Sequence, residues 1–424
     1  MRSSADDAIA RLDALLREVA RVEESEFAYP EGRDALKAVA LKLNRVRSDL
    51  LANTPNASAQ SQRVLCALAL REVRDHLAIV GLLLRSTNVR NAFETVRPLQ
   101  RLARSLLEPN TPRSDRSTRL VLSSEWEYSP FVLDRVPDLD GFVLVGLPAS
   151  ESGNPLLLPL AGHELGHPAW RKFSMHDHIY PSAVKVLYAH ADQEQSKLRG
   201  WFSIPLSEDV FENLFARQLR ADSLIYAMYQ CQEMFCDLVE LRLFGRGYLR
   251  AFAYLLAPQP SAIRSPRYPH IRTRAVVLAN AARRFGFAPV DGFVERFDEG
   301  TVDDGRSAEA RTREALADCV VPGVADLLVE RAEEIARAAG VVLPTDDASE
   351  AVFRALAAGA PHPDPASLAD IVNAGWLAYD AESLWSRHDI APDDVRAVVR
   401  DIVLKCIEVL DIHQTIAEMQ HVEG

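Results

Sequence analysis

Apolar residues recur every three or four positions along the first hundred residues of the chain, with charged residues between them. This spacing places the apolar side chains on one face of a helix, so it predicts amphipathic helices rather than strands. We therefore expect a helical N-terminal region over residues 1–110, serving as a bundle core or a docking arm. The three predicted stripes are Ile9, Leu12, Leu16, Val19 and Val22; Leu36, Val39, Leu43, Val46 and Leu50; and Val64, Leu68, Val73, Leu77 and Val80.

The period of the pattern changes after the turn-forming stretch EPNTPRSDRS at 108–117. β-Branched and aromatic residues bounded by Pro and Gly predict strands near residues 119–128 and 141–147. The second strand could pair with an extended substrate as an edge strand, or it could be internal to a sheet. A loop follows, in which Asn154 is a candidate N-cap and Pro155 suits the first position of a mostly apolar helix.

Helical periodicity returns from residue 182 to residue 245, where Gly245 suits the C-cap of the last helix. Further on, acidic loops alternate with amphipathic helices up to residue 424. We therefore expect an α+β protein that is predominantly helical, with a short sheet. The predicted domains are a helical region over 1–110, a metal-binding catalytic domain over 111–290 and a helical region over 291–424.

Composition and charge narrow the classes of function. The 60 acidic residues outnumber the 48 basic ones, and the net charge of -12 argues against a general nucleic-acid or anionic-membrane surface. The five cysteines show no paired C-x-x-C spacing, which indicates free thiols in a reducing compartment. The apolar stretch at 77–84 is far shorter than the about 20 residues that cross a bilayer, and the N-terminus resembles no signal peptide. These features predict a cytoplasmic protein.

The stretch AGHELGHPAW at 161–170 carries the clearest chemical signal in the chain. His163 and His167 are four positions apart, so on a helix both imidazoles can reach one metal ion. Glu164 follows the first histidine, where its carboxylate can reach a water on that ion. About 0.02 matches to this pattern are expected by chance in a chain of this composition. The pattern therefore favours a zinc site over two histidines that are bonded only to backbone.

A catalytic zinc site needs a third protein ligand and one open position. The strongest candidate is Glu233, because Asp237 lies one turn further on the same predicted helix and could accept the N–H of a ligand histidine. Glu240 lies on the same side of this helix and is the local rival. Weaker alternatives are Asp304, within GTVDD, and the cluster of His176, Asp177 and His178.

Together, HELGH and the later EMFCD resemble the gluzincin group of zinc metallopeptidases, whose thermolysin-like fold carries His-Glu-x-x-His and Glu-x-x-x-Asp on two helices. The resemblance covers about residues 115–290, and the flanks of both motifs resemble uncharacterised bacterial zincin-like proteins. It implies that His163, His167 and Glu233 bind zinc. It also implies that Glu164 is the general base and that Asp237 orients His163.

The same resemblance implies a hydrolase that cleaves peptide bonds in a protein or peptide substrate. The net charge and the short apolar stretches predict no nucleic-acid or membrane partner. Gluzincins stabilise the oxyanion with a downstream Tyr or His, and the candidates here are Tyr268, His270 and Arg274. The alternative is a non-catalytic zincin-fold protein that binds or regulates a partner. The helical regions also leave homo-oligomerisation open.

Pro168 follows the second histidine directly. It has no N–H to donate to the carbonyl of Glu164, and it disfavours helical geometry at His167. We therefore expect the motif helix to end or kink at His167.

Overall fold

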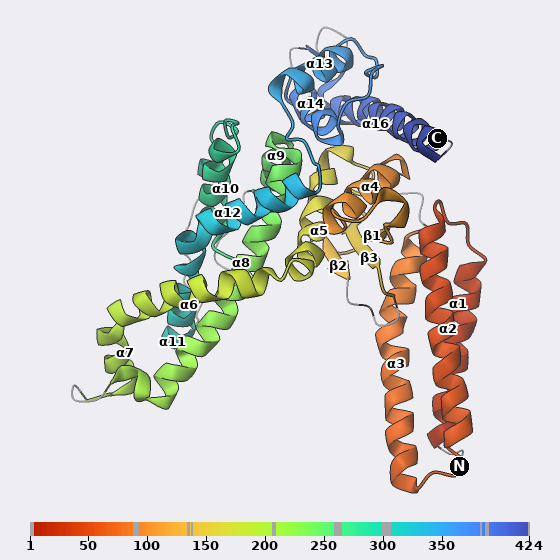
Figure 1. Ribbon diagram of the computed structural model, residues 1–424, viewed down its shortest axis with the longest axis vertical. Coiled ribbons are helices and arrows are strands. Elements are labelled where there is room, and N and C mark those ends of the chain that lie inside the picture. Colours follow the sequence, from red (N-terminus) through yellow and green to blue (C-terminus); the bar gives the residue numbers. More distant parts are fainter. Residues whose placement is uncertain are drawn as a thin grey trace. The chain divides into compact units, whose positions relative to one another are not determined.

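The structure, a computed structural model, is predominantly helical and has one three-stranded sheet among its described residues (Figure 1). Two compact units divide the chain. The first comprises residues 1–104 and 112–155, and the second comprises 105–111 and 156–424. The strands therefore belong with the N-terminal helices, while the division into three domains stays a prediction. The structure describes residues 4–87, 93–133, 136, 139–205, 209–257, 265–297, 307–381, 384–385 and 390–422.

Three long helices form an apolar core in the first unit. They are α1 (Ser4–Glu23), α2 (Pro30–Asn53) and α3 (Ala59–Arg85), and α4 (Val96–Leu107) follows them in the chain. The side chain of Ser58 caps α3 by accepting a hydrogen bond of 3.2 Å from the backbone N–H of Ser61. The stripes predicted for α1 and α2 are confirmed, because their members are buried or packed against the core. Fully buried leucines of this core include Leu12, Leu36, Leu43 and Leu83.

The apolar stripe predicted for α3 is confirmed for two of its five members, because Val80 is buried and Val73 packs against the core. Val64, Leu68 and Leu77 are exposed, at 50%, 46% and 58%, so their assignment to the core is wrong. The face that α3 buries contains small and polar side chains as well as large apolar ones. Because alanine and cysteine fill a core as readily as leucine does, a pattern read from large residues alone misplaced these three positions. The buried residues of α3 are Cys66, Ala69, His76, Ile79, Val80, Leu82 and Leu83.

The sheet of the first unit confirms both predicted strands and adds a third. Its strands are β1 (Arg119–Glu125), β2 (Phe131–Leu133) and β3 (Phe142–Pro148), in the order β1-β3-β2. β1 pairs with β3 in parallel, and β2 pairs with β3 antiparallel. Since β3 has a partner on each side, it is the internal strand, and the alternative that it pairs with a substrate as an edge strand is wrong. Gly146 makes room for the Phe131 ring, because a Cβ there would lie 2.5 Å from its Cε1.

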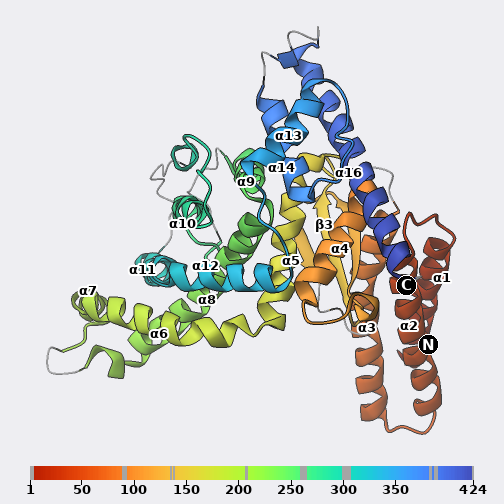
Figure 2. The same cartoon turned by 45° about the horizontal axis from the view of Figure 1, so that its top comes forward.

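The second unit is helical throughout its described residues (Figure 2). None of the helices described in either unit is both long and apolar enough to span a membrane. In chain order, the helices of this unit are α5 (Leu158–Lys172), α6 (Met175–Gln193), α7 (Gln195–Phe202), α8 (Leu214–Phe244), α9 (Arg246–Leu256), α10 (Ile271–Arg284), α11 (Ala308–Asp318), α12 (Val320–Ala338), α13 (Asp346–Ala357), α14 (Leu368–Asp380) and α16 (Pro392–Val422).

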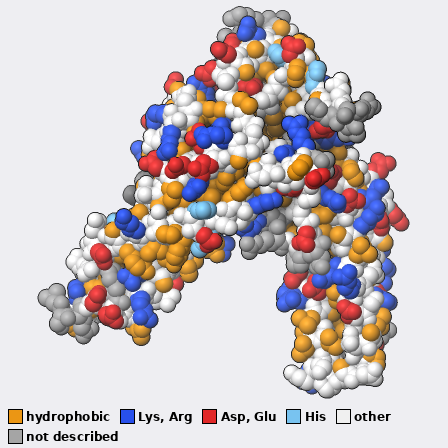
Figure 3. Space-filling model, viewed as in Figure 1, with side chains coloured by type: hydrophobic (Ala, Val, Ile, Leu, Met, Phe, Trp, Pro, Cys, Tyr) orange, Lys and Arg blue, Asp and Glu red, His pale blue; other side chains and the backbone are white. Residues whose placement is uncertain are grey.

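Helix α8 is the element around which the second unit packs, with α5, α6, α11 and α12 against it. Its two halves differ. The first half exposes apolar side chains such as Phe215 and Ile225, and Figure 3 shows hydrophobic groups gathered on the surface over α6 and α8. The second half is almost completely buried from Met234 to Phe244. The helix therefore runs from an exposed beginning into the core of the unit.

The buried end of α8 is closed by two features. Gly245 is the C-cap, as predicted, and its φ of 60° is a conformation that glycine adopts without strain. Asn373 of α14 donates a hydrogen bond of 2.8 Å to the carbonyl oxygen of Phe244, and its Oδ1 accepts one of 2.7 Å from the backbone N–H of Gly247. Helix α14 thus joins the end of α8 to the beginning of α9.

Candidate metal centre

Helix α5 presents the two motif histidines on one face. Pro155 opens a short 3₁₀ turn, and α5 begins three residues later with Leu157 as its N-cap residue, so the predicted N-cap at Asn154 is wrong. The helix buries an apolar run that includes Leu158, Leu160 and Leu165. His163 and His167 are one turn apart, and their ring centroids are 5.4 Å from each other. Both side chains are largely buried, at 13% and 16% exposed. The histidines therefore point toward the same place, in a poorly hydrated environment.

The predicted end of this helix at His167 is wrong, because α5 continues through Pro168 to Lys172. The proline still deprives the Glu164 carbonyl of a helical N–H donor. What keeps the last turn helical is packing: Ala169 and Trp170 are buried, and the Trp170 ring contacts Phe235 of α8 with centroids 5.4 Å apart. Tertiary contacts thus outweigh the local preference of the proline.

Two glycines allow α8 to approach α5 closely. A Cβ on Gly166 would lie 2.7 Å from the Cα of Cys236, a distance that no real Cβ tolerates against backbone. A Cβ on Gly162 would lie 3.0 Å from the Phe244 ring and 3.4 Å from the Glu240 side chain. The two helices consequently meet almost backbone to backbone, directly between the two histidines of the motif.

The side chains of α8 that face α5 are spaced three and four residues apart, at Glu233, Cys236, Asp237 and Glu240. The Nδ1 atom of His163 lies 2.9 Å from Asp237 Oδ1, and its Nε2 lies 3.3 Å from Glu233 Oε2. The Nε2 atom of His167 lies 4.0 Å from Glu233 Oε1. The helix pair thus gives His163 a carboxylate on each side of its ring and brings Glu233 toward both histidines.

Asp237 is fully buried and lies at the centre of a charged network. Arg274 of α10 binds it through two hydrogen bonds, from Nε at 2.8 Å and from Nη2 at 2.7 Å. The Tyr248 hydroxyl of α9 donates a third, of 2.7 Å. Burial alone would raise the pKa of Asp237, but the Arg274 charge and the His163 hydrogen bond hold it well below its ordinary value. Asp237 therefore stays ionised and fixes the His163 ring.

The other ionisable groups of the centre have perturbed pKa values with identifiable causes. Burial raises the pKa of Glu164 to about 7, against the opposing charge of His163. Burial and His163 together lower the pKa of His167 to about 4. Burial disfavours the charged form of His163, but hydrogen bonds to Asp237 and Glu233 raise its pKa well above the ordinary value. The pKa values of the two histidines are thus shifted in opposite directions although the residues share one helix face.

The three residues predicted to stabilise an oxyanion lie in different settings. The Arg274 guanidinium is bound to Asp237, so it supports the histidine side of the centre. His270 is the N-cap residue of α10. Tyr268 is 42% exposed, and the charge of Glu233 and burial raise its pKa to about 12. Of the three, Tyr268 combines an electrostatic coupling to Glu233 with access to solvent.

The weaker third-ligand alternatives and the local rival Glu240 lie in different settings. His176, Asp177 and His178 are exposed in the first turn of α6, where His176 stacks on Tyr180. Asp304 lies outside the described residues. Glu240 is fully buried, and neither of its carboxylate oxygens has a hydrogen-bond partner among the described residues. Burial raises its pKa well above the ordinary value.

The sequence reasoning missed Cys236. Its Sγ and one ring nitrogen each of His163 and His167 all lie within 4.8 Å of one another, so these three residues could hold a metal ion. Its position three residues after Glu233 was the available signal, because that spacing puts both on one helix face. Two imidazoles, a thiol and a carboxylate are donors that suit zinc, and the Glu233 Oε2 atom is buried 3.3 Å from His163 Nε2. This donor set fits the predicted metal.

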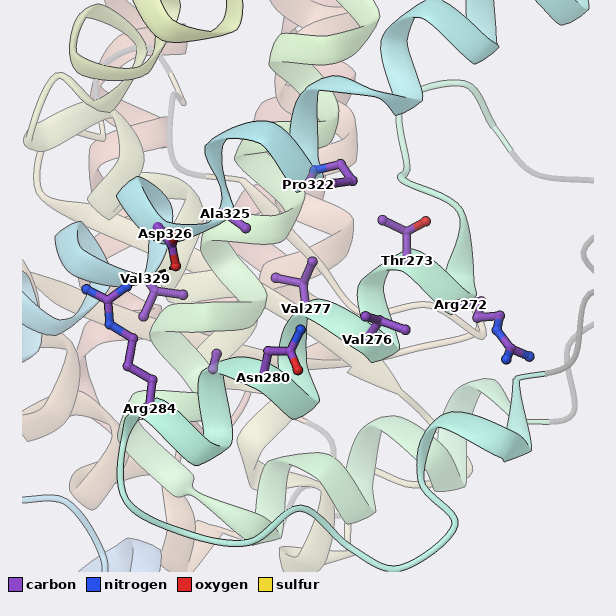
Figure 4. A pocket seen from close by; sticks show the side chains of 11 residues that line it. Arg272, Thr273, Val276, Val277, Asn280, Arg284, Pro322, Ala325, Asp326 and Val329 are labelled. Atoms are coloured by element: carbon purple, nitrogen blue, oxygen red, sulfur yellow. Dashed lines mark hydrogen bonds and ion pairs between the residues drawn. The ribbon is translucent and has the colours of Figure 1, made fainter. Parts of the chain in front are cut away.

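A separate hollow of the second unit lies between α10 and α12 (Figure 4). Its volume is about 550 Å³, and the ion pair of Arg284 Nη1 with Asp326 Oδ1, 3.1 Å long, lies at its wall. None of the side chains that surround the metal centre lines it.

No protein-family model matches the chain, and neither does any curated protein or any solved structure.

Proposed function

We propose that the protein is a zinc-dependent metallopeptidase of the gluzincin kind, acting on protein or peptide substrates. The observation that carries the proposal is that both ring nitrogens of His163 contact a carboxylate. Asp237 engages one nitrogen of its ring, so the other is directed toward Glu233 and toward the side of His167. A ligand histidine in a zinc enzyme is typically held in this way by a carboxylate behind it.

Bound zinc would be held by His163, His167 and Glu233, and it would supply Lewis acidity and a water of lowered pKa. Glu164 is placed to take and return a proton, because its Oε2 lies 3.9 Å from His167 Nε2 and it is almost fully buried. The Tyr268 hydroxyl is the candidate donor to a developing oxyanion. Arg274 and Tyr248 keep Asp237 ionised and in place, so they act through His163.

The thermolysin-like arrangement is proposed for the helix pair α5 and α8, whose motifs face each other across Gly166. The five cysteines are all free, which supports the proposal of a reducing, cytoplasmic compartment. A second candidate function is a non-catalytic zincin-fold protein. It is favoured by one observation, the Cys236 thiol, which could fill the position that a catalytic zinc keeps open.

Metal analysis combined with a search for newly formed peptide termini tests the proposal. The wild-type protein should bind one zinc per chain and generate cleavage products from a cell extract. His163→Ala should lose both, whereas Glu164→Gln should keep the zinc and lose turnover by a factor of at least about 100. His176→Ala, a change of an exposed histidine on α6, is the matched control and should change neither. Wild-type protein without zinc, or full activity in Glu164→Gln, would contradict the proposal.

A further inference from the structure

We propose that Cys236 is a protein ligand of the same metal ion, so that the centre is closed by two histidines, one carboxylate and one thiolate. This inference rests on the proposed metal centre and adds a fourth ligand that the gluzincin pattern does not contain. Such a four-ligand centre has no free position until one ligand leaves. It therefore describes a resting state that must open before substrate can be processed.

The position of the Cys236 side chain carries the inference. Its Sγ lies within 4.8 Å of a ring nitrogen of each motif histidine, while the side chain itself is fully buried. The sulfur also lies 2.8 Å from where a Cβ on Gly166 would be. It therefore packs against α5 at Gly166, within reach of an ion that both histidines could bind.

Cys231 shows what an ordinary buried thiol looks like on the same helix. It is also fully buried on α8, and burial raises its pKa to about 12. Five residues separate it from Cys236, which places it on another face, and it belongs to no metal-binding group among the described residues. Packing alone explains Cys231. Cys236 differs from it because its Sγ lies within 4.8 Å of a ring nitrogen of each motif histidine.

The carboxylates of Glu233 and Asp237, which contact His163, favour a cation beside Cys236. When a divalent ion binds there, the S–H proton leaves to solvent as the sulfur–metal bond forms. Thiolate ligation also predicts a preference for zinc, cobalt or cadmium over magnesium or calcium, which take oxygen ligands.

Cobalt titration of the purified full-length protein tests the proposal, because a thiolate bound to Co²⁺ gives an intense near-ultraviolet charge-transfer band. The wild-type protein should develop this band in proportion to added metal and saturate at one ion per chain. Cys236→Ser should bind cobalt without the band, and with an affinity lowered about 10-fold or more. Cys231→Ser, the matched control, should keep the band. His163→Ala should lose it, because the thiolate then has no complete centre.

X-ray absorption of the zinc-loaded wild-type protein tests the same point without any substitution. A sulfur ligand appears at about 2.3 Å from zinc, whereas nitrogen and oxygen ligands appear at about 2.0–2.1 Å. One sulfur per zinc supports the proposal. One metal ion bound with only nitrogen and oxygen neighbours overturns it and leaves the proposed peptidase intact. Failure of the wild-type protein to bind zinc or cobalt at all overturns the metal centre itself.

Discussion

The helix contacts of the first unit and those around α8 in the second bury very different side chains. Between α1, α2 and α3 the core is almost entirely aliphatic. Between α5 and α8 the equivalent space holds imidazoles, carboxylates and, from α10, a guanidinium. Apolar burial stabilises a fold at about 25 cal/mol per Å². Buried charges contribute little net stability, and removing one partner is costly.

The buried charges between α5 and α8 stabilise the fold less than an apolar core would, which indicates that they serve another purpose. A core of well-packed leucines could replace the Asp237 network, with no loss of stability expected. The network violates the rule that buried positions are apolar, and such violations are expected at functional sites. If the comparison is correct, substitutions in the two regions should change the free energy of unfolding by different amounts, with different signs and with different dependence on pH.

The largest effect is expected for Arg274→Ala. It leaves Asp237 buried with its main counter-charge removed, so the free energy of unfolding should fall by about 3–5 kcal/mol. Denaturant unfolding of the metal-free protein measures this loss. Arg284→Ala on the same helix is the control, because its ion pair with the exposed Asp326 should leave stability nearly unchanged. Equal effects of the two changes would mean that the Asp237 network is not strongly coupled.

The bundle core should respond through packing alone. Leu36→Ala removes a fully buried side chain and should cost about 3 kcal/mol, with the loss independent of pH and of added zinc. Leu41→Ala, at a position that is 70% exposed on the same helix, is its control. Circular dichroism during denaturant unfolding follows both. A zinc-dependent change in the Leu36 variant would break the distinction between the two regions.

Gly166→Ala should disturb the helix contact at the metal centre. The added methyl group meets backbone of Cys236, so α5 and α8 must separate, at a cost of about 1–3 kcal/mol. Zinc affinity should fall in the same variant. Gly200→Ala is the matched control, because no described residue outside its own helical turn lies within 4 Å of a Cβ at this position. It should keep or slightly raise stability. Calorimetric titration with zinc and thermal unfolding measure the two quantities.

Glu240→Met should raise the free energy of unfolding, whereas the substitutions described above, controls aside, lower it. The carboxyl is buried without a hydrogen-bond partner in the described chain, so an apolar side chain of similar size should stabilise by about 1–2 kcal/mol at neutral pH. Because the folded pKa is raised, the unfolded state ionises first as pH rises above about 4.5, and the wild type loses stability. The gain in the variant should therefore grow between pH 4 and pH 8. Unfolding at both pH values, with exposed Glu330→Met as control, checks this.

The smallest effect is expected on the outer face of α3. Leu77→Gln replaces a side chain that is 58% exposed, so the free energy of unfolding should change by no more than about 0.5 kcal/mol. The sequence pattern assigned Leu77 to the core, whereas the structure exposes it, so the measurement decides between the two. A loss near that of Leu36→Ala would show that this face is covered by something the chain binds.

The sequence predicted those features that depend on short-range spacing. The i, i+4 histidines, the Glu233 and Asp237 pair, two strands and the Gly245 cap all follow from local periodicity. Tertiary packing decided the rest. Pro168 is held in a helix by Trp170 and Phe235. The hydrogen bonds between Arg274 and Asp237 join two residues that are 37 positions apart in sequence. No local pattern contains such information.

Part of the buried face of α3 and Cys236 were missed for a related reason. In both cases a small side chain occupies a position where the pattern expects a large apolar residue or a familiar ligand. Alanine and cysteine carry little weight in a hydrophobic pattern, yet they fill cores and, for cysteine, bind metals. The three-residue strand β2 was missed because so short a segment carries almost no periodicity.

The hydrogen bonds of Asn373 join segments of the second unit that are synthesised at different times. This residue closes the end of α8, yet it lies 129 positions after Phe244, the residue whose carbonyl it binds. At roughly 5–20 residues per second, a ribosome needs on the order of ten seconds to make the intervening chain. Throughout that interval the newly made α8 lacks this partner at its C-terminal end. The C-terminal end of the helix that carries half of the candidate metal ligands is therefore completed only after Asn373 has been made.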